Sequence, residues 1–169
     1  MRAALPEPSC AYNGPLYRAL NPIWARDPLS GAGAKRHGGR FNAKGRAALY
    51  TALTIMGAVA EANQIGRPFE PVTLVSYAAD LDNLFDSLNP AHLAAHGISA
   101  ADLAADDWRL QMMARGTSKA QDIAEALIAA GYHGLIAPSF AKGAAADARN
   151  LVLWHWAGLK LIDTEHRLT

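Results

Sequence analysis

The sequence predicts a single domain of the α+β class, and three observations lead to that prediction. The chain has 169 residues, a length that favours one domain with one core. Hydrophobic residues make up 51% of the chain and charged residues only 18%, a composition too apolar for a disordered protein. Segments with helical periodicity alternate with short β-prone runs, so we expect both kinds of element to build the core.

The first 47 residues are predicted to be mostly irregular. Residues 1–15 are rich in proline and are expected to form an irregular N-terminal arm, so that the domain proper spans residues 16–169. Residues 16–20 are predicted to be a short strand. Residues 21–47 are interrupted by proline and glycine and read as a long loop. Long loops with interleaved aromatic and cationic side chains are often functional, which favours a site here.

The next segment is predicted to be a strand over residues 48–51, followed by a helix. Thr54 has the residue type that caps a helix, and Gly66 follows a pattern that runs to about residue 65. Glu61 lies at the border of the apolar face of this helix, which consists of Ile55, Ala58, Val59, Ala62 and Ile65. We therefore expect Glu61 to point sideways into a cleft.

The remaining elements are predicted from β-propensity and capping signals. Ser118-Lys119-Ala120-Gln121 forms a capping box and should start an amphipathic helix that ends at Gly131. Strands are expected over residues 71–81, 133–137, 150–156 and 159–162, and shorter helices over residues 90–96, from Ser99, and over 106–114.

Several function classes are disfavoured by composition. The chain has 16 basic and 15 acidic residues, which does not indicate a polyanion-binding protein, and we expect no direct contact with nucleic acid. The lone cysteine, Cys10, excludes an intramolecular disulfide, and no Cys/His spacing suggests a metal site. No apolar run is long enough to span a membrane, and Pro6 interrupts the N-terminus before a signal-peptide core. We therefore expect a cytoplasmic protein.

Glycine and arginine are concentrated in the segment around Gly38-Gly39-Arg40. Glycine allows the backbone to approach a ligand, and the arginine fork suits phosphate oxygens. The run Gly31-Ala32-Gly33 lacks the third glycine of a dinucleotide-binding fingerprint, and no Walker motif occurs. A Rossmann or P-loop site is thus disfavoured, and the sequence instead offers a cationic clamp made of Arg18, Lys35, Arg36 and Arg40.

Tyr50 and Glu61 add a second chemical element. A carboxylate close to a ribose can stabilise the positive charge that develops when a glycosidic bond breaks. An aromatic ring can stack on the leaving base.

These segments together resemble the RES domain family. The resemblance rests on Leu16-Tyr17-Arg18, on the run from Asp27 to Asn42, on Ala48-Leu49-Tyr50 and on Glu61, in matching order and spacing. It implies the toxin of a bacterial toxin–antitoxin pair, with a fold similar to the diphtheria-toxin type of ADP-ribosyltransferase, in which mixed and antiparallel sheets are flanked by helices. It also implies that NAD is consumed, by transfer of ADP-ribose, by hydrolysis or by phosphorolysis.

The resemblance assigns roles to individual residues. Arg18 and Arg40 would hold the phosphates or riboses of NAD, Tyr50 would stack on nicotinamide, and Glu61 would stabilise the ribosyl cation. Ser139 would be the family serine that lines the pocket, with Ser118 as the competing candidate, and Asn150 would support it. No metal is implied. Val59 stands two residues before Glu61, so the Glu-x-Glu pair of arginine-modifying transferases is absent.

The leading hypothesis is an ADP-ribosyltransferase toxin that modifies a cellular protein and is blocked by an Xre-type helix-turn-helix antitoxin at its active site. The same residues would serve an NAD glycohydrolase or an NAD phosphorylase. Two alternatives belong to other classes. An RNA-cleaving toxin would use the basic run Lys35-Arg36-His37 with His133 and His155, and an interaction module would use the apolar run from Leu151 to Trp156.

Overall fold

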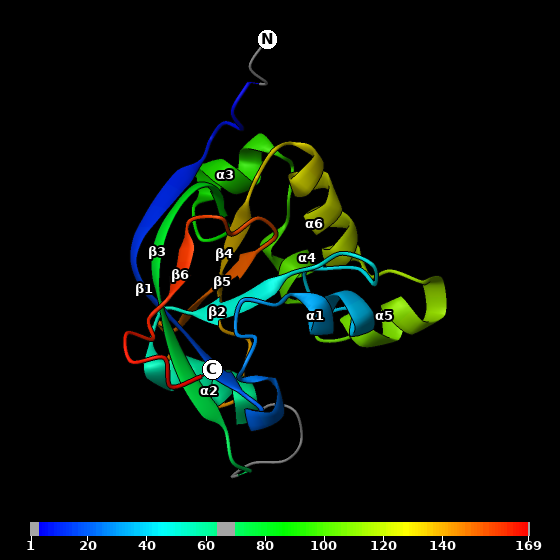
Figure 1. Cartoon of the computed structure of the whole chain (residues 1–169). Coiled ribbons are helices and arrows are strands. Elements are labelled where there is room, and N and C mark those ends of the chain that lie inside the picture. The colour runs from blue at the N-terminus through cyan, green and yellow to red at the C-terminus, as the bar shows by residue number, and fades with distance from the viewer. Residues whose placement is uncertain (1–3, 64–69, 169) are drawn as a thin grey trace.

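The computed structural model describes residues 4–63 and 70–168, which form a sheet flanked by helices (Figure 1). The strands are β1 (Cys10–Leu20), β2 (Leu49–Ala52), β3 (Thr73–Asp86), β4 (Gly134–Pro138), β5 (Arg149–Leu153) and β6 (Leu159–Leu161). The helices are η1 (Pro22–Trp24), α1 (Ala32–His37), α2 (Ile55–Ala62), α3 (Pro90–Ala95), α4 (Ala100–Ala104), α5 (Trp108–Arg115) and α6 (Lys119–Ala129). The predicted α+β class is confirmed.

The sheet closes on itself. Its strand order is β1-β2-β5-β4-β3-β6, and β1 also pairs with β3, so that five strands form a ring to which β6 is added at β3. The β3–β4 pairing is parallel and the other pairings are antiparallel. In Figure 1, α4, α5 and α6 lie to the right of this sheet, α3 lies at its upper end and α2 at its lower end.

Side chains of alternate strand residues belong to two hydrophobic clusters, which lie on opposite faces of the sheet. On β5, Leu151 and Leu153 belong to a cluster with Leu16, Tyr77 and Leu84, all completely buried. Val152 points the other way and packs with helix residues such as Leu103 of α4 and Leu127 of α6. The apolar run from Leu151 is therefore core, which disfavours its use as an interaction surface.

The N-terminal arm is shorter than the sequence predicts. β1 begins at Cys10, so the irregular arm expected over residues 1–15 is wrong for residues 10–15. The strand pairs with β3 from Cys10 to Leu20, whereas β2 joins it only at Tyr17. One edge of the first half of β1 is thus unpaired, and such an edge tolerates Pro15, which lacks an N–H group.

The segment over residues 21–47 is more regular than predicted. It contains η1 and α1, and the expectation of a continuous loop is wrong for residues 22–24 and 32–37. Gly31 and Gly33 obscure the helical signal of α1. Gly38 ends α1 with φ of 74°, a left-handed conformation that favours glycine.

α2 begins as predicted, because the Thr54 side chain accepts a hydrogen bond from the Gly57 N–H. The expected end of this helix at Ile65 and Gly66 lies outside the described residues. Ala58 is buried as expected, but Ile55 is 46% exposed, so the predicted apolar face is wrong at its first position. Gly57 is buried instead, and a Cβ atom there would approach Thr54 Oγ1 to 2.9 Å.

The C-terminal half follows the predicted order with shifted boundaries. Ser118 and Gln121 form the predicted capping box at the start of α6. β3 is longer than the strand expected over residues 71–81, and β5 ends at Leu153, before the expected 156. Trp108 is buried at the start of α5, as expected.

Candidate functional site: a cationic cleft around a carboxylate

A cleft of about 470 Å³ lies against the sheet and collects most of the predicted site residues. Its volume falls within the range of small-molecule sites. Five of the six predicted residues line it, namely Arg18, Arg40, Tyr50, Glu61 and Asn150. The sixth, Ser139, is not among the lining residues, although its neighbours Pro138 and Phe140 are.

Glu61 accepts hydrogen bonds from two side chains that lie far away in the sequence. Its Oε1 accepts a hydrogen bond of 2.7 Å from Ser139 Oγ and another of 2.7 Å from Asn150 Nδ2. Asn150 lies on β5 opposite Ala52 of β2 and Ala137 of β4, so the register of three strands brings these groups together. Hydrogen bonds to a carboxylate are strong and fix its direction. Glu61 is therefore a positioned carboxylate.

Asn150 retains an unused hydrogen-bond acceptor. Because a carboxylate only accepts, the contact with Glu61 fixes which end of the Asn150 amide is the nitrogen. Its Oδ1 is buried and has no hydrogen-bond partner within the described part of the chain. A buried acceptor without a donor costs about 1–3 kcal/mol, and such costs are tolerated mainly at functional sites.

Arg40 supplies a fixed positive charge to the cleft. Its Nη1 donates to the carbonyl oxygens of Leu103 at 3.2 Å and Ala105 at 2.8 Å, and its guanidinium lies 4.3 Å from the centroid of the Phe140 ring. Burial lowers the pKa of this guanidinium from its ordinary value, the Asp106 carboxylate opposes that shift, and Glu61 opposes it more weakly. Glu61 and Arg40 thus lie within electrostatic reach of each other.

Arg18 reaches the cleft from β1 and is anchored by a backbone carbonyl. Its Nη1 donates to Pro28 O at 3.1 Å, and the buried Tyr77 hydroxyl donates to the same oxygen at 2.6 Å. This contact ties the loop after η1 to the sheet, and Arg18 has further N–H donors while lining the cleft. Arg18 and Arg40 therefore line the cleft from different segments, namely β1 and the turn after α1.

Tyr50 presents its ring to the cleft and not its hydroxyl. The hydroxyl donates to Asn42 Oδ1 at 2.6 Å and accepts from the Phe41 N–H at 3.0 Å. Burial raises the pKa of this phenol well above its ordinary value, so the group stays protonated at neutral pH. Proton transfer by Tyr50 is thus disfavoured, and stacking through the ring is the role that this arrangement permits.

Two buried amides that the sequence analysis did not assign to the site hold the turn that carries Arg40. Asn42 donates to Ala34 O at 2.8 Å and to Arg46 O at 2.9 Å, and Gln121 donates to Gly39 O at 2.8 Å and to Asn42 O at 3.1 Å. Both side chains are fully buried. Asn42 directly follows Arg40-Phe41, but only the fold shows that Gln121 of α6 reaches this turn.

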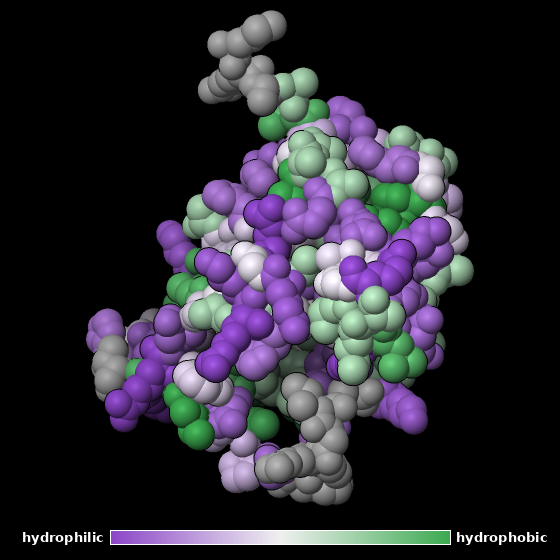
Figure 2. Space-filling view, turned by 90° about the vertical axis from the view of Figure 1, so that its right-hand side faces the viewer, coloured by the Kyte–Doolittle hydropathy of each residue, from purple (hydrophilic) through white to green (hydrophobic). Residues whose placement is uncertain are grey.

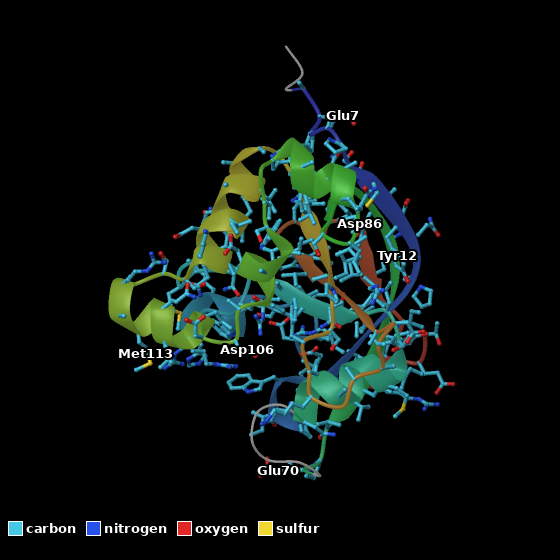
Figure 3. The ribbon with its side chains drawn as sticks, turned by 180° about the vertical axis from the view of Figure 1, so that it is seen from behind. Glu7, Tyr12, Glu70, Asp86, Asp106 and Met113 are labelled. Carbon is cyan, nitrogen blue, oxygen red and sulfur yellow. The ribbon has the colours of Figure 1, made fainter. Side chains whose placement is uncertain are left out.

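The cleft wall also includes Trp108 and Arg109 of α5 and Phe140, which the sequence analysis did not assign to a site. The sequence signal that could have indicated a site at residues 108–109 is an aromatic residue followed by a cation at the start of a predicted helix. Figure 3 shows Asp106 on the segment before α5 and Met113 at the far end of that helix, pointing away from the body of the molecule.

The competing sequence candidates lie elsewhere. Ser118 is occupied as the cap of α6, where its Oγ accepts from the Gln121 N–H. His133 contacts Asp82 at 3.1 Å and lies against His155 in a tilted arrangement with ring centroids 4.6 Å apart, and neither histidine lines the cleft. Lys35 and Arg36 belong to the last turn of α1. The two histidines of the RNA-cleaving alternative therefore lie next to each other, but outside the cleft.

Among residues 4–63 and 70–168 no cluster of His, Cys, Asp and Glu side chains could hold a metal ion. No helix in the same part of the chain is both long and apolar enough to cross a membrane. On the face shown in Figure 2, hydrophobic groups form small patches among hydrophilic ones.

Comparisons with known proteins point to one family. The family model described as the RES domain matches residues 15–168. Among solved structures, the chain is similar to a chain in the crystal structure of the M. tuberculosis MbcT–MbcA toxin–antitoxin complex, with 24% identity and a TM-score of 0.65. That match covers 92% of this chain and 84% of the other, and at this identity it supports the fold alone. No curated protein matches in sequence.

Proposed function

The chain belongs to the RES domain family, and from that premise we propose that it is a toxin that binds NAD and cleaves the bond between nicotinamide and ribose. ADP-ribose is then transferred to a cellular protein. The catalytic unit is the whole closed sheet with its helices, including β1 from Cys10 onwards. The similarity in fold to a chain of a toxin–antitoxin complex supports the assignment as a toxin, and the relationship to diphtheria-toxin-type transferases is part of this proposal.

The observation that carries the proposal is the positioned carboxylate of Glu61 in a cleft lined by arginines. Rupture of the glycosidic bond leaves positive charge on the ribose, and a carboxylate fixed beside that ring stabilises the transition state. Nicotinamide departs as a neutral ring, so no dedicated general acid is needed. The face of the Tyr50 ring in the cleft offers a platform for it, and Arg18 and Arg40 offer donors for the phosphates or riboses.

The acceptor distinguishes this reaction from its alternatives. Water in place of a protein side chain would make the chain an NAD glycohydrolase, and inorganic phosphate would make it an NAD phosphorylase. All three reactions use the same carboxylate and the same cations.

The test follows nicotinamide release and label transfer together, with NAD labelled on the adenylate phosphate and with or without cell lysate. We expect nicotinamide release and a labelled lysate protein. Release without labelling would replace transfer by hydrolysis or, when ADP-ribose 1″-phosphate forms on addition of phosphate, by phosphorolysis. No release from folded protein would contradict the proposal.

A partner forms part of the proposal. We expect an Xre-type helix-turn-helix antitoxin to cover the cleft, and exposed apolar side chains on helices that contribute to the cleft wall support a protein partner there, namely Met56 on α2 and Leu110 and Met113 on α5. Addition of the antitoxin to the assay should therefore suppress nicotinamide release, and full turnover in the complex would contradict this part.

Ser139 is proposed as a positioning residue that acts through Glu61. Ser139→Ala removes one of the two donors to Glu61 Oε1, so we expect kcat to fall by about tenfold, the effect of one charge-assisted hydrogen bond, with little change in the KM for NAD. Steady-state kinetics measure both constants. Ser87→Ala, which removes a hydroxyl that donates to Ile136 O outside the cleft, is the matched control. A change confined to KM would mean that Ser139 contacts substrate directly.

A further inference from the structure

The cleft carries a cation to which no role has been assigned. Arg109, in the first turn of α5, lines the cleft and is exposed. Its guanidinium lies 4.4 Å from the centroid of the Trp108 ring, and Trp108 is itself only 7% exposed. A buried aromatic face under a cation restricts where the cation can go. Arg109 is thus held at the cleft wall by a rigid platform.

Arg109 and Arg40 lie on the same side of the cleft. The bonds from Arg40 to the carbonyls of Leu103 and Ala105 tie the Gly39–Asn42 turn to the segment just before α5. The two arginines are close enough for the charge of Arg109 to contribute to the lowered pKa of Arg40. The helix that bears Arg109 is therefore fastened to the turn that bears Arg40.

This pair of like charges is poorly compensated. Asp106 lies 3.7 Å from Arg40, but its side chain is 99% exposed, and ion pairs of that kind contribute little. Within the described ranges Arg109 forms no ion pair with a carboxylate. Two neighbouring guanidinium groups at a cleft wall, with hydrogen-bond donors unused, are suited to an anion with more than one charged oxygen.

We infer that Arg40 and Arg109 together bind the diphosphate of the dinucleotide substrate, with Arg109 on the phosphate that bears adenosine. The inference rests on the proposed function for the direction of the substrate. Glu61 acts at the nicotinamide ribose from α2, and Arg40 lies within electrostatic reach of both Glu61 and Arg109. Glu61 is on α2 and Arg109 is on α5, and these two helices lie apart in Figure 1. We therefore assign the phosphate nearer to the nicotinamide ribose to Arg40 and the other phosphate to Arg109.

The experiment compares Arg109→Ala and Arg109→Lys with Arg115→Ala, a control on the same helix whose side chain pairs with Asp122 outside the cleft. Calorimetry measures the binding of ADP-ribose and of nicotinamide mononucleotide, which has one phosphate. We expect Arg109→Ala to weaken ADP-ribose binding by about tenfold, the loss of one charge-assisted contact, and to leave mononucleotide binding within about twofold. Arg109→Lys should restore part of the affinity, because it keeps the charge but loses the fork. Arg115→Ala should bind both as the wild type does.

Each outcome separates this inference from the proposed function. Wild-type affinity of Arg109→Ala for ADP-ribose would overturn the inference, and equal weakening for both ligands would move Arg109 to the first phosphate and overturn its assigned position. If the wild type binds neither nucleotide, the proposed function fails. Inorganic pyrophosphate then tests the cation pair alone: binding that is lost in Arg109→Ala but kept in Arg115→Ala would support a diphosphate site, and no binding would refute it.

Discussion

Glu61→Gln is expected to slow nicotinamide release by at least about 100-fold, the order of effect found when a group that stabilises transition-state charge is removed. Gln has the same shape, and its side-chain oxygen can still accept from Ser139 and Asn150. What it lacks is the negative charge that balances the ribosyl cation. The loss should therefore appear in kcat, with a smaller change in the KM for NAD.

The measurement combines single-turnover kinetics with growth of cells that express the variant. Glu125→Gln provides the matched control, because Glu125 forms a bidentate pair with Arg46, neither residue lines the cleft, and the variant should retain full activity. Thermal unfolding of both variants checks that the fold is intact. Wild-type turnover and wild-type toxicity of Glu61→Gln would remove Glu61 from the mechanism and, with it, the proposed chemistry.

The partners of Glu61 mark the limit of what the sequence could predict. Ser139 and Asn150 lie 78 and 89 residues further along the chain, and they reach Glu61 because β2, β5 and β4 pair in one particular register. Strand register depends on long-range packing that local patterns do not encode. The resemblance to a family named these residues, but their contact with a single carboxylate oxygen is a property of the folded sheet.

Local signals predicted local structure well. Thr54 and the Ser118–Gln121 capping box mark helix starts, since a cap depends only on residues within one turn. The same reasoning failed for β1, where proline and glycine suggested an irregular arm over residues that in fact pair with β3. It also gave no hint that the Tyr50 hydroxyl is occupied by Asn42, or that Arg109 reaches the cleft, because both facts depend on tertiary packing.

Asn42→Ala is expected to lower the free energy of unfolding by about 3 kcal/mol or more, through the loss of partners for several buried groups. Asn42 is completely buried, and its amide serves both the Tyr50 hydroxyl and the carbonyls of Ala34 and Arg46. Alanine fills neither role, so the Tyr50 hydroxyl loses its acceptor and the Arg46 carbonyl loses its side-chain donor, while the Ala34 carbonyl keeps only the Gly38 N–H. Urea unfolding with an unchanged m-value would measure the effect as a shift in midpoint.

Asn13→Ala is the control, because that amide is exposed and makes one long contact of 3.4 Å with Asp80. Its expected cost is within about 0.5 kcal/mol. The comparison bears on function because the Asn42 network fixes the turn that carries Arg40 and the ring of Tyr50. If Asn42→Ala were as stable as Asn13→Ala, the turn would hold without its buried amide, and the rigidity assigned to the cationic wall of the cleft would need another source. If it is destabilised but still folded at low temperature, its KM for NAD should rise as the turn loosens, whereas Asn13→Ala should leave the KM unchanged.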